Sequence, residues 1–293
     1  MPRIAVIADI HANLFALEAV IDDLQARGVD EVIVAGDLVG RGPQGSAVVH
    51  RIADLGWPCV RGNHEDYLLS FCRRDVPDSW LRTEEWAASR WMAEELDEAA
   101  IRFIDSLPFY RRSQLCEDVE VYHGSPNSHS EGIGRWTPEE RLSEYLEIID
   151  GSVLVCAHTH RPLEHHGDEG TIVNVGSVGL PFNGDWRAQY AILEHSTTGW
   201  IVEFARVPYP RQKLFDHYID SGFFDEGGVT AKLLYRELEY ARPFLVPFLR
   251  WAEICNYPPT SDSIDEFLGI YDPGVSMSEF FARLSGGIPP SSS

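Results

Sequence analysis

The chain carries aspartate, asparagine and histidine residues directly after several of its short apolar segments. In chain order these residues are Asp9, His11, Asp37, Asn63, His64, His123, His158 and His160. Each of them alone has an ordinary explanation, such as a helix cap, a turn or a solvated histidine. Repeated at the ends of apolar segments, they are typical of one site assembled at the edge of a sheet.

The residue types favour a divalent cation at that site. Carboxylate, amide and neutral imidazole groups supply oxygen and nitrogen ligands without thiolate, which suits manganese, iron or zinc better than calcium or a structural zinc ion. Without His64, seven such groups remain, which is more than a single ion needs. A two-metal site with one bridging carboxylate uses the whole set. In an extended chain, residues two apart face the same way, so the Asp-x-His and His-x-His pairs can serve one ion or two adjacent ions.

A parallel sheet is expected to bring the first of these residues together. The predicted strands are residues 3–8, 31–36 and 58–63, and the predicted helices between them are residues 13–28 and 43–56. Asn13 is a suitable N-cap for the first helix, and Gly28 stands just past its end. This βαβαβ order predicts parallel strands with right-handed crossovers, whose carboxyl ends meet at one edge.

The middle of the chain predicts a different arrangement. Residues 78–107 carry tryptophan and leucine at three- and four-residue steps, which is typical of amphipathic helices, and packing explains these tryptophans better than a cofactor role. Strand-like runs follow from residue 119 to residue 206, with one helical insertion at 138–149. Consecutive strands without helices between them favour hairpins, and hence a second sheet or an antiparallel extension of the first.

The pattern changes again after residue 207. Helical segments broken by proline and glycine dominate from there on, so residues 208–293 are predicted to form a helical C-terminal extension. Its last residues, GGIPPSSS at 286–293, are expected to be a flexible tail. The oligomeric state stays open, and the helical extension is a candidate contact between copies.

Charge and composition exclude several classes of function. The net charge of −22 disfavours stable binding to nucleic acid, because that binding depends on clustered lysine and arginine. Any anionic substrate must therefore be held by local positive charge. The chain shows neither a signal-peptide pattern nor an apolar run long enough for a membrane span, so a cytoplasmic protein without membrane contact is expected. Five cysteines without a CxxC pair predict reduced thiols.

The motifs taken together resemble a known superfamily. DxH, GDLVGRGP, GNHE, HG and AHTH, in this order and followed by NVGSVG, resemble the calcineurin-like metallophosphoesterases. The greatest likeness is to the bacterial diadenosine tetraphosphatase and serine/threonine phosphatase branch, and it covers about residues 3–207. The resemblance implies an α/β fold in which two mixed sheets and flanking helices form a four-layer α-β-β-α sandwich. Residues 1–207 would be the catalytic domain, with the helical extension outside it.

The resemblance also implies roles for the site residues. One metal ion would be held by Asp9, His11 and His160. The other would be held by Asn63, His123 and His158. Asp37 would bridge the two ions, and Arg41 would bind the phosphate of the substrate. His64 would stabilise the transition state or protonate the leaving oxygen.

The activity implied by the resemblance is hydrolysis of phosphate esters. Two divalent ions, of manganese, iron, zinc or nickel, would hold a bridging hydroxide that attacks phosphorus in line. The substrate would be a small phosphoester, including nucleotides, or a phosphoprotein, with monoester, diester and dinucleoside polyphosphate left open. The alternative is a non-catalytic interaction or scaffold module, because the superfamily includes such proteins. Scaffolds commonly lose ligands or the catalytic histidine, whereas this chain keeps all of them.

Two positions depart from the family pattern. The serine/threonine phosphatases have an aspartate in GDxVDRG that supports the catalytic histidine, and this chain has Gly40 there. The partner of His64 is therefore unaccounted for by the motif. Ala157 stands where the family usually has glycine before HxH, and its methyl group is expected to be tolerated.

Overall fold

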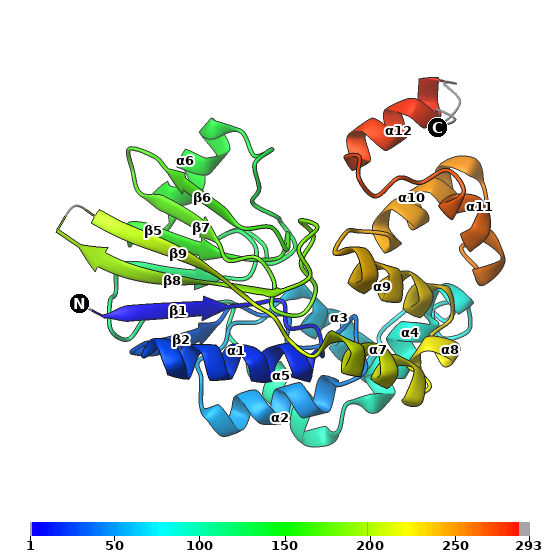
Figure 1. Cartoon of the computed structure of the whole chain (residues 1–293), viewed down its shortest axis with the longest axis horizontal. Coiled ribbons are helices and arrows are strands. Elements are labelled where there is room, and N and C mark those ends of the chain that lie inside the picture. Colours follow the sequence, from blue (N-terminus) through cyan, green and yellow to red (C-terminus); the bar gives the residue numbers. More distant parts are fainter. Residues whose placement is uncertain (1, 198, 287–293) are drawn as a thin grey trace.

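Two β-sheets face each other and form the centre of the molecule (Figure 1). The computed structural model describes residues 2–197 and 199–286. The first sheet has the order β2-β1-β8-β9, with bounds Glu31–Val34, Arg3–Ile7, Ala188–Ser196 and Gly199–Val207. The second has the order β3-β4-β5-β7-β6, with bounds Tyr110–Arg112, Val119–Tyr122, Val153–Cys156, Thr171–Asn174 and Leu163–His166. Both sheets are mixed, since β1 runs parallel to β2 and antiparallel to β8, and β5 runs parallel to β7, which is antiparallel to β6.

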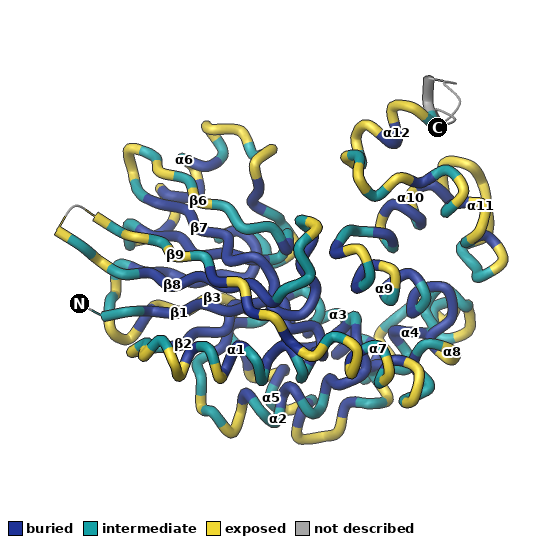
Figure 2. The backbone as a smooth tube through the Cα atoms, in the orientation of Figure 1, coloured by how far each residue is buried: buried dark blue, intermediate teal, exposed yellow. Residues whose placement is uncertain are grey.

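Alternation along the strands divides the apolar residues between two layers. On β1, Ile4 and Val6 point into the layer between the sheets, where they meet Val121 and Val155 of the second sheet. Their neighbours Ala5 and Ile7 point the other way, toward the helices. Figure 2 shows the buried residues following the strands of both sheets.

Helices cover the outer faces of both sheets. The first sheet is covered by α1, α2 and α5, with bounds Leu14–Arg27, Gly45–Leu55 and Glu98–Asp105. The second is covered by α6, Glu139–Ile148, through an apolar cluster that includes Tyr145 and Ile172. The predicted four-layer sandwich is therefore confirmed (Figure 1). The first helix begins as predicted, because the Asn13 side chain accepts a hydrogen bond from the Ala16 amide, and it ends at Gly28 with a φ of 62°.

The predicted third strand at 58–63 is wrong. Cys59 forms only an isolated bridge with Val34, and helix α3, Asn63–Cys72, begins directly afterwards. Glu65 stands at the third position of this helix and accepts a hydrogen bond from the Gly62 amide, which turns the chain into a helix. The sequence did not predict strand β3, because its residues YRR are all exposed and do not alternate between apolar and polar side chains.

The tryptophans at 80, 86 and 91 pack against other rings, as the packing interpretation requires. Trp80 and Trp86 stack with ring centroids 3.8 Å apart, and Trp91 lies 4.9 Å from Phe223. They belong to the segment with the short helix Glu84–Trp86 and helix α4, Ala87–Glu95. Residues 84–95 of this segment pack against residues 223–240, near the start of the C-terminal helices.

The C-terminal helices lie beside one end of the sandwich (Figure 1). They are α7 to α12, with bounds Arg211–Asp220, Phe223–Glu226, Gly228–Tyr240, Leu245–Cys255, Ile264–Leu268 and Met277–Gly286. Tyr218 and Leu234 share the apolar core of α1 and α2, whereas Phe248 and Phe267 form a separate cluster among α9 to α12. The domain boundary at residue 207 stays a prediction. The predicted tail starts at Gly286, the last residue of α12, and otherwise lies outside the described residues.

In the described ranges 2–197 and 199–286, none of the helices combines the length and the hydropathy that a membrane span requires.

Candidate metal centre

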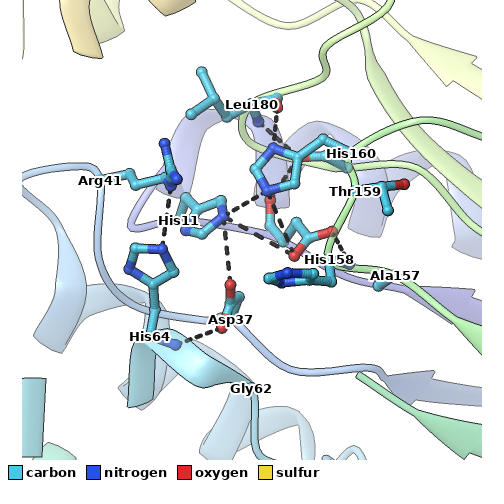
Figure 3. A network of polar contacts seen from close by, with 12 residues as sticks. His11, Asp37, Arg41, Gly62, His64, Ala157, His158, Thr159, His160 and Leu180 are labelled. Carbon is cyan, nitrogen blue, oxygen red and sulfur yellow. Dashed lines mark hydrogen bonds and ion pairs between the residues drawn. The ribbon is translucent and has the colours of Figure 1, made fainter. Parts of the chain in front are cut away.

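The ends of four strands meet at one edge of the sandwich and bring the predicted site residues together (Figure 3). Asp9 and His11 follow β1, and Asp37 follows β2. His123 follows β4 directly, and the AHTH stretch follows β5. Asn63 and His64 form the first turn of α3 at the same edge.

Asp9, His11 and His160 form a first group of possible metal ligands. The Nε2 atoms of His11 and His160 are 3.0 Å apart, and they lie 3.9 Å and 3.7 Å from Oδ1 of Asp9. All three residues are buried. This is the same grouping that the family resemblance implies for one ion.

Asp37, His123 and His158 form a second group, joined by Asn63. Oδ1 of Asn63 lies 3.0 Å from Nε2 of His123 and 2.8 Å from Nδ1 of His158. Oδ2 of Asp37 lies 3.3 Å from Nε2 of His123. The same oxygen is 3.7 Å from Nε2 of His11, so Asp37 stands between the two groups. The ligand roles themselves stay predictions.

The backbone at seven positions of the site is left-handed and not extended. Among the residues that the structure describes, ten non-glycine residues have a positive φ. Seven of them belong to this site: Asp9, His11, Ala12, Asp37, Arg41, His158 and His160. The expectation that the Asp-x-His and His-x-His pairs face one way on extended chain is therefore wrong. Left-handed non-glycine residues cost energy and cluster at functional sites, where surrounding contacts hold them.

The facing histidines of the first group leave space that suits a cation. Nδ1 of His11 faces the Val39 carbonyl at 3.2 Å, and Nδ1 of His160 faces the Leu180 carbonyl at 2.5 Å. A carbonyl only accepts, so each Nδ1 carries the proton and each Nε2 carries a lone pair. Two lone pairs then face each other across 3.0 Å, and Oδ1 of Asp9 is buried beside them with no hydrogen-bond partner among residues 2–197 and 199–286. A bound cation satisfies all three atoms at once.

Three imidazoles and one carboxylate of the site are in the protonation states that metal ligands need. Burial lowers the pKa of His11 and of His160 well below the ordinary value, so both rings are neutral. Burial, followed by the charge of His123, lowers the pKa of His158 to about 4. Burial acts to raise the pKa of Asp37, but His123 and His64 outweigh it and hold that pKa well below its ordinary value. His11, His158 and His160 therefore offer neutral imidazoles and Asp37 offers an ionised carboxylate, which are the forms that bind metal ions.

Burial acts to lower the pKa of His123, but the charge of Asp37 outweighs it and raises that pKa to about 10. Burial raises the pKa of Asp9 well above its ordinary value, so a bound cation would displace a proton from each of these two groups.

His64 and Arg41 lie next to the second group. The backbone amide of His64 donates to Oδ1 of Asp37 at 2.9 Å, which orients the carboxylate. Nε of Arg41 donates to Nε2 of His64 at 3.2 Å. Nδ1 of His64 is buried and has no hydrogen-bond partner among the residues that the structure describes, and a Cβ atom at Gly40 would lie 2.4 Å from it. Gly40, which stands where the serine/threonine phosphatases have an aspartate, thus lies against the His64 ring but has no side chain that could accept a hydrogen bond from it.

Glu237, from the C-terminal helix α9, reaches this site and was not predicted from the sequence. Its Oε2 accepts from Nη1 of Arg41 at 3.0 Å, and the side chain is buried. The Tyr218 hydroxyl from α7 donates to the Arg41 carbonyl. The C-terminal helices therefore hold the arginine expected to bind phosphate. The available signal was a glutamate on the apolar face of α9, between Leu234 and Leu238.

Glu65, the last letter of GNHE, is a second functional residue that the sequence interpretation left without a role. Its buried carboxylate accepts from the amides of Asp37, Leu38 and Gly62 at 2.9, 2.7 and 2.7 Å. Burial raises the pKa of Glu65 to about 7, and the charge of Asp37 adds to the increase. Glu65 thus connects the loop that carries Asp37 to the helix that carries His64.

Known proteins are similar to this chain over much of its length. The family model described as calcineurin-like phosphoesterase matches residues 2–162. The uncharacterized protein MJ0912 of Methanocaldococcus jannaschii is 28% identical over 233 residues, which cover 74% of this chain and 91% of that protein.

Two solved structures share the fold. A metallophosphoesterase from Sphaerobacter thermophilus is 29% identical with a TM-score of 0.65, covering 82% of this chain and 99% of its own. The hypothetical protein PH1004 from Pyrococcus horikoshii OT3 is 22% identical with a TM-score of 0.67, covering 80% of this chain and 98% of its own. Both matches are longer than residues 1–207, so they include part of the C-terminal helices.

Proposed function

Because the chain belongs to the calcineurin-like phosphoesterase family, we propose that it is a dinuclear metal-dependent phosphoesterase acting on phosphate monoesters or diesters. One observation carries the proposal. Two groups of oxygen and nitrogen donors meet at Asp37. In one of them, the lone pairs of His11 and His160 lie near Oδ1 of Asp9, which has no hydrogen-bond partner in the described part of the chain. A protein without a cation at this position would bury these acceptors at a substantial cost in stability.

The residues present fit two divalent ions. One would be held by Asp9, His11 and His160. The other would be held by Asn63, His123 and His158. Asp37 would be shared between them, since its Oδ2 lies within 3.7 Å of ring nitrogens from both groups. Bound divalent ions of manganese, iron, zinc or nickel would supply an activated water and stabilise charge on the phosphoryl oxygens.

The protein's own groups would position the substrate around this centre. The Arg41 guanidinium supplies a planar fork that suits two phosphate oxygens. Glu237 holds this fork in place from α9. His64 lies within hydrogen-bond distance of Arg41 and is proposed to protonate the leaving oxygen once the guanidinium has turned to the phosphate.

The decisive experiment combines metal analysis with hydrolysis. The purified chain is loaded with manganese, its metal content is measured, and it is assayed on p-nitrophenyl phosphate, bis-p-nitrophenyl phosphate and nucleotides. The expected result is about two metal ions per chain and hydrolysis of at least one of these esters that stops on chelation. Asp37→Asn should lower the bound metal and reduce kcat/KM by about 100-fold or more, whereas Asp54→Asn, at an exposed position in α2, should not.

Other outcomes of this experiment have a clear meaning. Full metal-dependent hydrolysis by Asp37→Asn would overturn the proposal. A chain that binds metal poorly and hydrolyses none of the esters would favour the non-catalytic interaction module instead. The relative rates on the monoester and the diester would decide which ester is preferred.

A further inference from the structure

A cleft of about 1250 Å³ opens between the AHTH loop, the loop at 134–136 and the C-terminal helices. Four arginines line it, although the chain as a whole carries a net charge of −22: Arg135, Arg161, Arg206 and Arg242. Three of them come from strands or loops of the sandwich, and Arg242 comes from the turn between α9 and α10. The cleft is thus built jointly by the sandwich and the C-terminal helices.

Two of these arginines converge without a counter-charge. Nε of Arg161 donates to the Phe182 carbonyl at 3.1 Å, and Nη1 of Arg242 approaches the same oxygen at 3.5 Å. No carboxylate in residues 2–197 or 199–286 lies within ion-pair distance of either guanidinium. Most other arginines of the chain, such as Arg27 and Arg112, do pair with acidic groups. Holding two like charges together without an acid is unfavourable unless an anion compensates them.

The cleft adjoins the metal centre. The Phe182 ring stacks on the His160 ring, with centroids 4.5 Å apart, so one phenylalanine separates the arginine pair from a predicted metal ligand. Gly132 lies so close to His158 that a Cβ atom there would be 3.3 Å from the imidazole. Gly134, two residues later, lines the cleft itself. The cleft therefore lies next to the predicted metal ligands His158 and His160.

The lining also offers a place for an aromatic group. Trp136 is 59% exposed, which is unusual for such a large apolar side chain, and the Arg161 guanidinium lies 6.0 Å from its ring centroid. Pro162, Val275 and Met277 add apolar surface around it. Guanidinium groups bind phosphate oxygens, and an exposed indole can stack on a planar base. This lining therefore suits a ligand in which a phosphate chain is joined to a base.

We propose that this cleft binds the remaining phosphates and the base of a nucleoside polyphosphate whose scissile phosphate lies at the metal centre. The proposal rests on the phosphoesterase function proposed above and names its substrate class. Arg161 and Arg242 hold the phosphate chain, and Trp136 stacks on the base. Glu164, which also lines the cleft, already contacts His166 at 3.0 Å and lies on the rim.

The first test measures binding without catalysis. The full chain is freed of metal with a chelator and titrated with tripolyphosphate in a calorimeter. The double variant Arg161→Gln/Arg242→Gln should bind about ten-fold more weakly or worse, because each charged hydrogen bond contributes substantially. Arg102→Gln removes an equal charge from the exposed surface of α5 and should bind like the unmodified chain. Unchanged binding by the double variant, or an equal loss in Arg102→Gln, would overturn the proposal.

A second variant tests the cleft independently, in case the double variant does not fold. Arg135 is exposed and lines the cleft, so Arg135→Gln should fold normally. It should weaken tripolyphosphate binding by roughly two- to five-fold, as expected for an exposed charge. Thermal unfolding of all variants is measured in parallel. Normal folding of Arg135→Gln with unchanged binding would count against the cleft as a phosphate site.

The second test separates the substrate class from the activity itself. In the manganese-loaded protein, the Arg161→Gln/Arg242→Gln variant should lose about ten-fold in kcat/KM for a nucleoside triphosphate and keep kcat/KM for p-nitrophenyl phosphate within about two-fold. An equal loss on both substrates would show that the arginines only support the fold of the metal centre. If the unmodified protein hydrolyses no ester at all, the proposed function fails, while the calorimetric result still decides whether the cleft binds phosphate chains.

Discussion

Arg41, which is partly buried, and the fully buried Glu237 form an ion pair across 196 positions of sequence, with Nη1 of the arginine 3.0 Å from Oε2 of the glutamate. The second carboxylate oxygen accepts from the backbone amides of Phe244 and Leu245 at 2.8 Å and 2.9 Å. Burial raises the pKa of Glu237, and the charge of Arg41 opposes that increase. Helix α9 thus contributes a charged residue to the metal centre, so the C-terminal helices are part of the site as well as of the fold.

Replacing Glu237 with glutamine should lower activity and stability together. The variant keeps an acceptor for the two amides but leaves the Arg41 charge without its partner, and breaking a buried pair in this way costs about 3 kcal/mol of unfolding free energy. A misplaced guanidinium should also reduce kcat/KM for phosphoesters about ten-fold. Urea unfolding and steady-state kinetics measure the two effects.

The neighbouring Glu239 supplies the matched control for that experiment. It stands two residues further along α9, is only partly buried and pairs with Arg236 near the surface. Glu239→Gln should leave both quantities nearly unchanged. Equal activity losses in the two variants would mean that the Arg41–Glu237 pair does not position the phosphate-binding group.

Much of the site could be predicted from the sequence because its residues follow strands. Asp9, Asp37 and His123 each come within three positions of the end of a strand, and parallel strands bring such ends to one edge. Glu237 lies on a helix and belongs to no motif. Its burial at an apolar helical position is visible in the sequence, but the identity of its partner depends on how α9 packs against the sandwich.

The conformation of the site could not be predicted in the same way. Aspartate and histidine prefer negative φ, so nothing in ADIH or AHTH indicates the left-handed backbone at Asp9, His11 and His158. That conformation depends on tertiary hydrogen bonds, such as the one from the His158 amide to Oδ2 of Asp9 at 3.1 Å. The false third strand has a similar cause, because the Glu65 carboxylate favours the start of a helix over continued pairing with β2.

Manganese should stabilise the chain through the facing histidines. Adding the ion at about 100 times its dissociation constant should raise the free energy of unfolding by about 2.7 kcal/mol, and a thermal melt should show the increase. His160→Ala removes one of the two facing lone pairs and should abolish most of the shift. His195→Ala, a histidine outside the metal centre that packs on Trp200, should keep it. A full manganese shift in His160→Ala would contradict the assignment of the first group as a metal site.

A methyl group at Gly40 should disturb His64. Gly40 has a φ of 80°, which costs an L-residue roughly 1–2 kcal/mol. The new Cβ atom would also lie 2.4 Å from Nδ1 of His64, so the ring must move. Gly40→Ala should therefore lower kcat for phosphoesters about ten-fold or more while metal content stays the same.

Gly56→Ala is the matched control, since Gly56 has a φ of 65° and open space around it, and it should lower stability but not kcat. Unchanged kcat in Gly40→Ala would mean that the position of the His64 ring is unimportant for the reaction.

Stability should fall as the pH rises through the range in which Glu95 ionises. The carboxylate of Glu95 accepts from the Ser46 amide at 3.1 Å, at the start of α2, yet burial outweighs these bonds and raises its pKa from 4.5 to about 7. A raised folded-state pKa means that the protonated form is favoured on folding, so this contribution is complete below pH 4.5 and disappears as the pH passes 7. The loss is at most about 3 kcal/mol, and solvent screening makes it smaller because the group is partly exposed.

Glu95→Gln keeps an acceptor for Ser46 and removes the titration, so urea unfolding between about pH 5 and pH 8 should show a flatter stability profile than that of the unmodified chain. Glu94→Gln, at the exposed neighbouring position, should keep the original slope. Identical profiles for the Glu95 variant and the unmodified chain would show that the pH dependence of stability arises elsewhere.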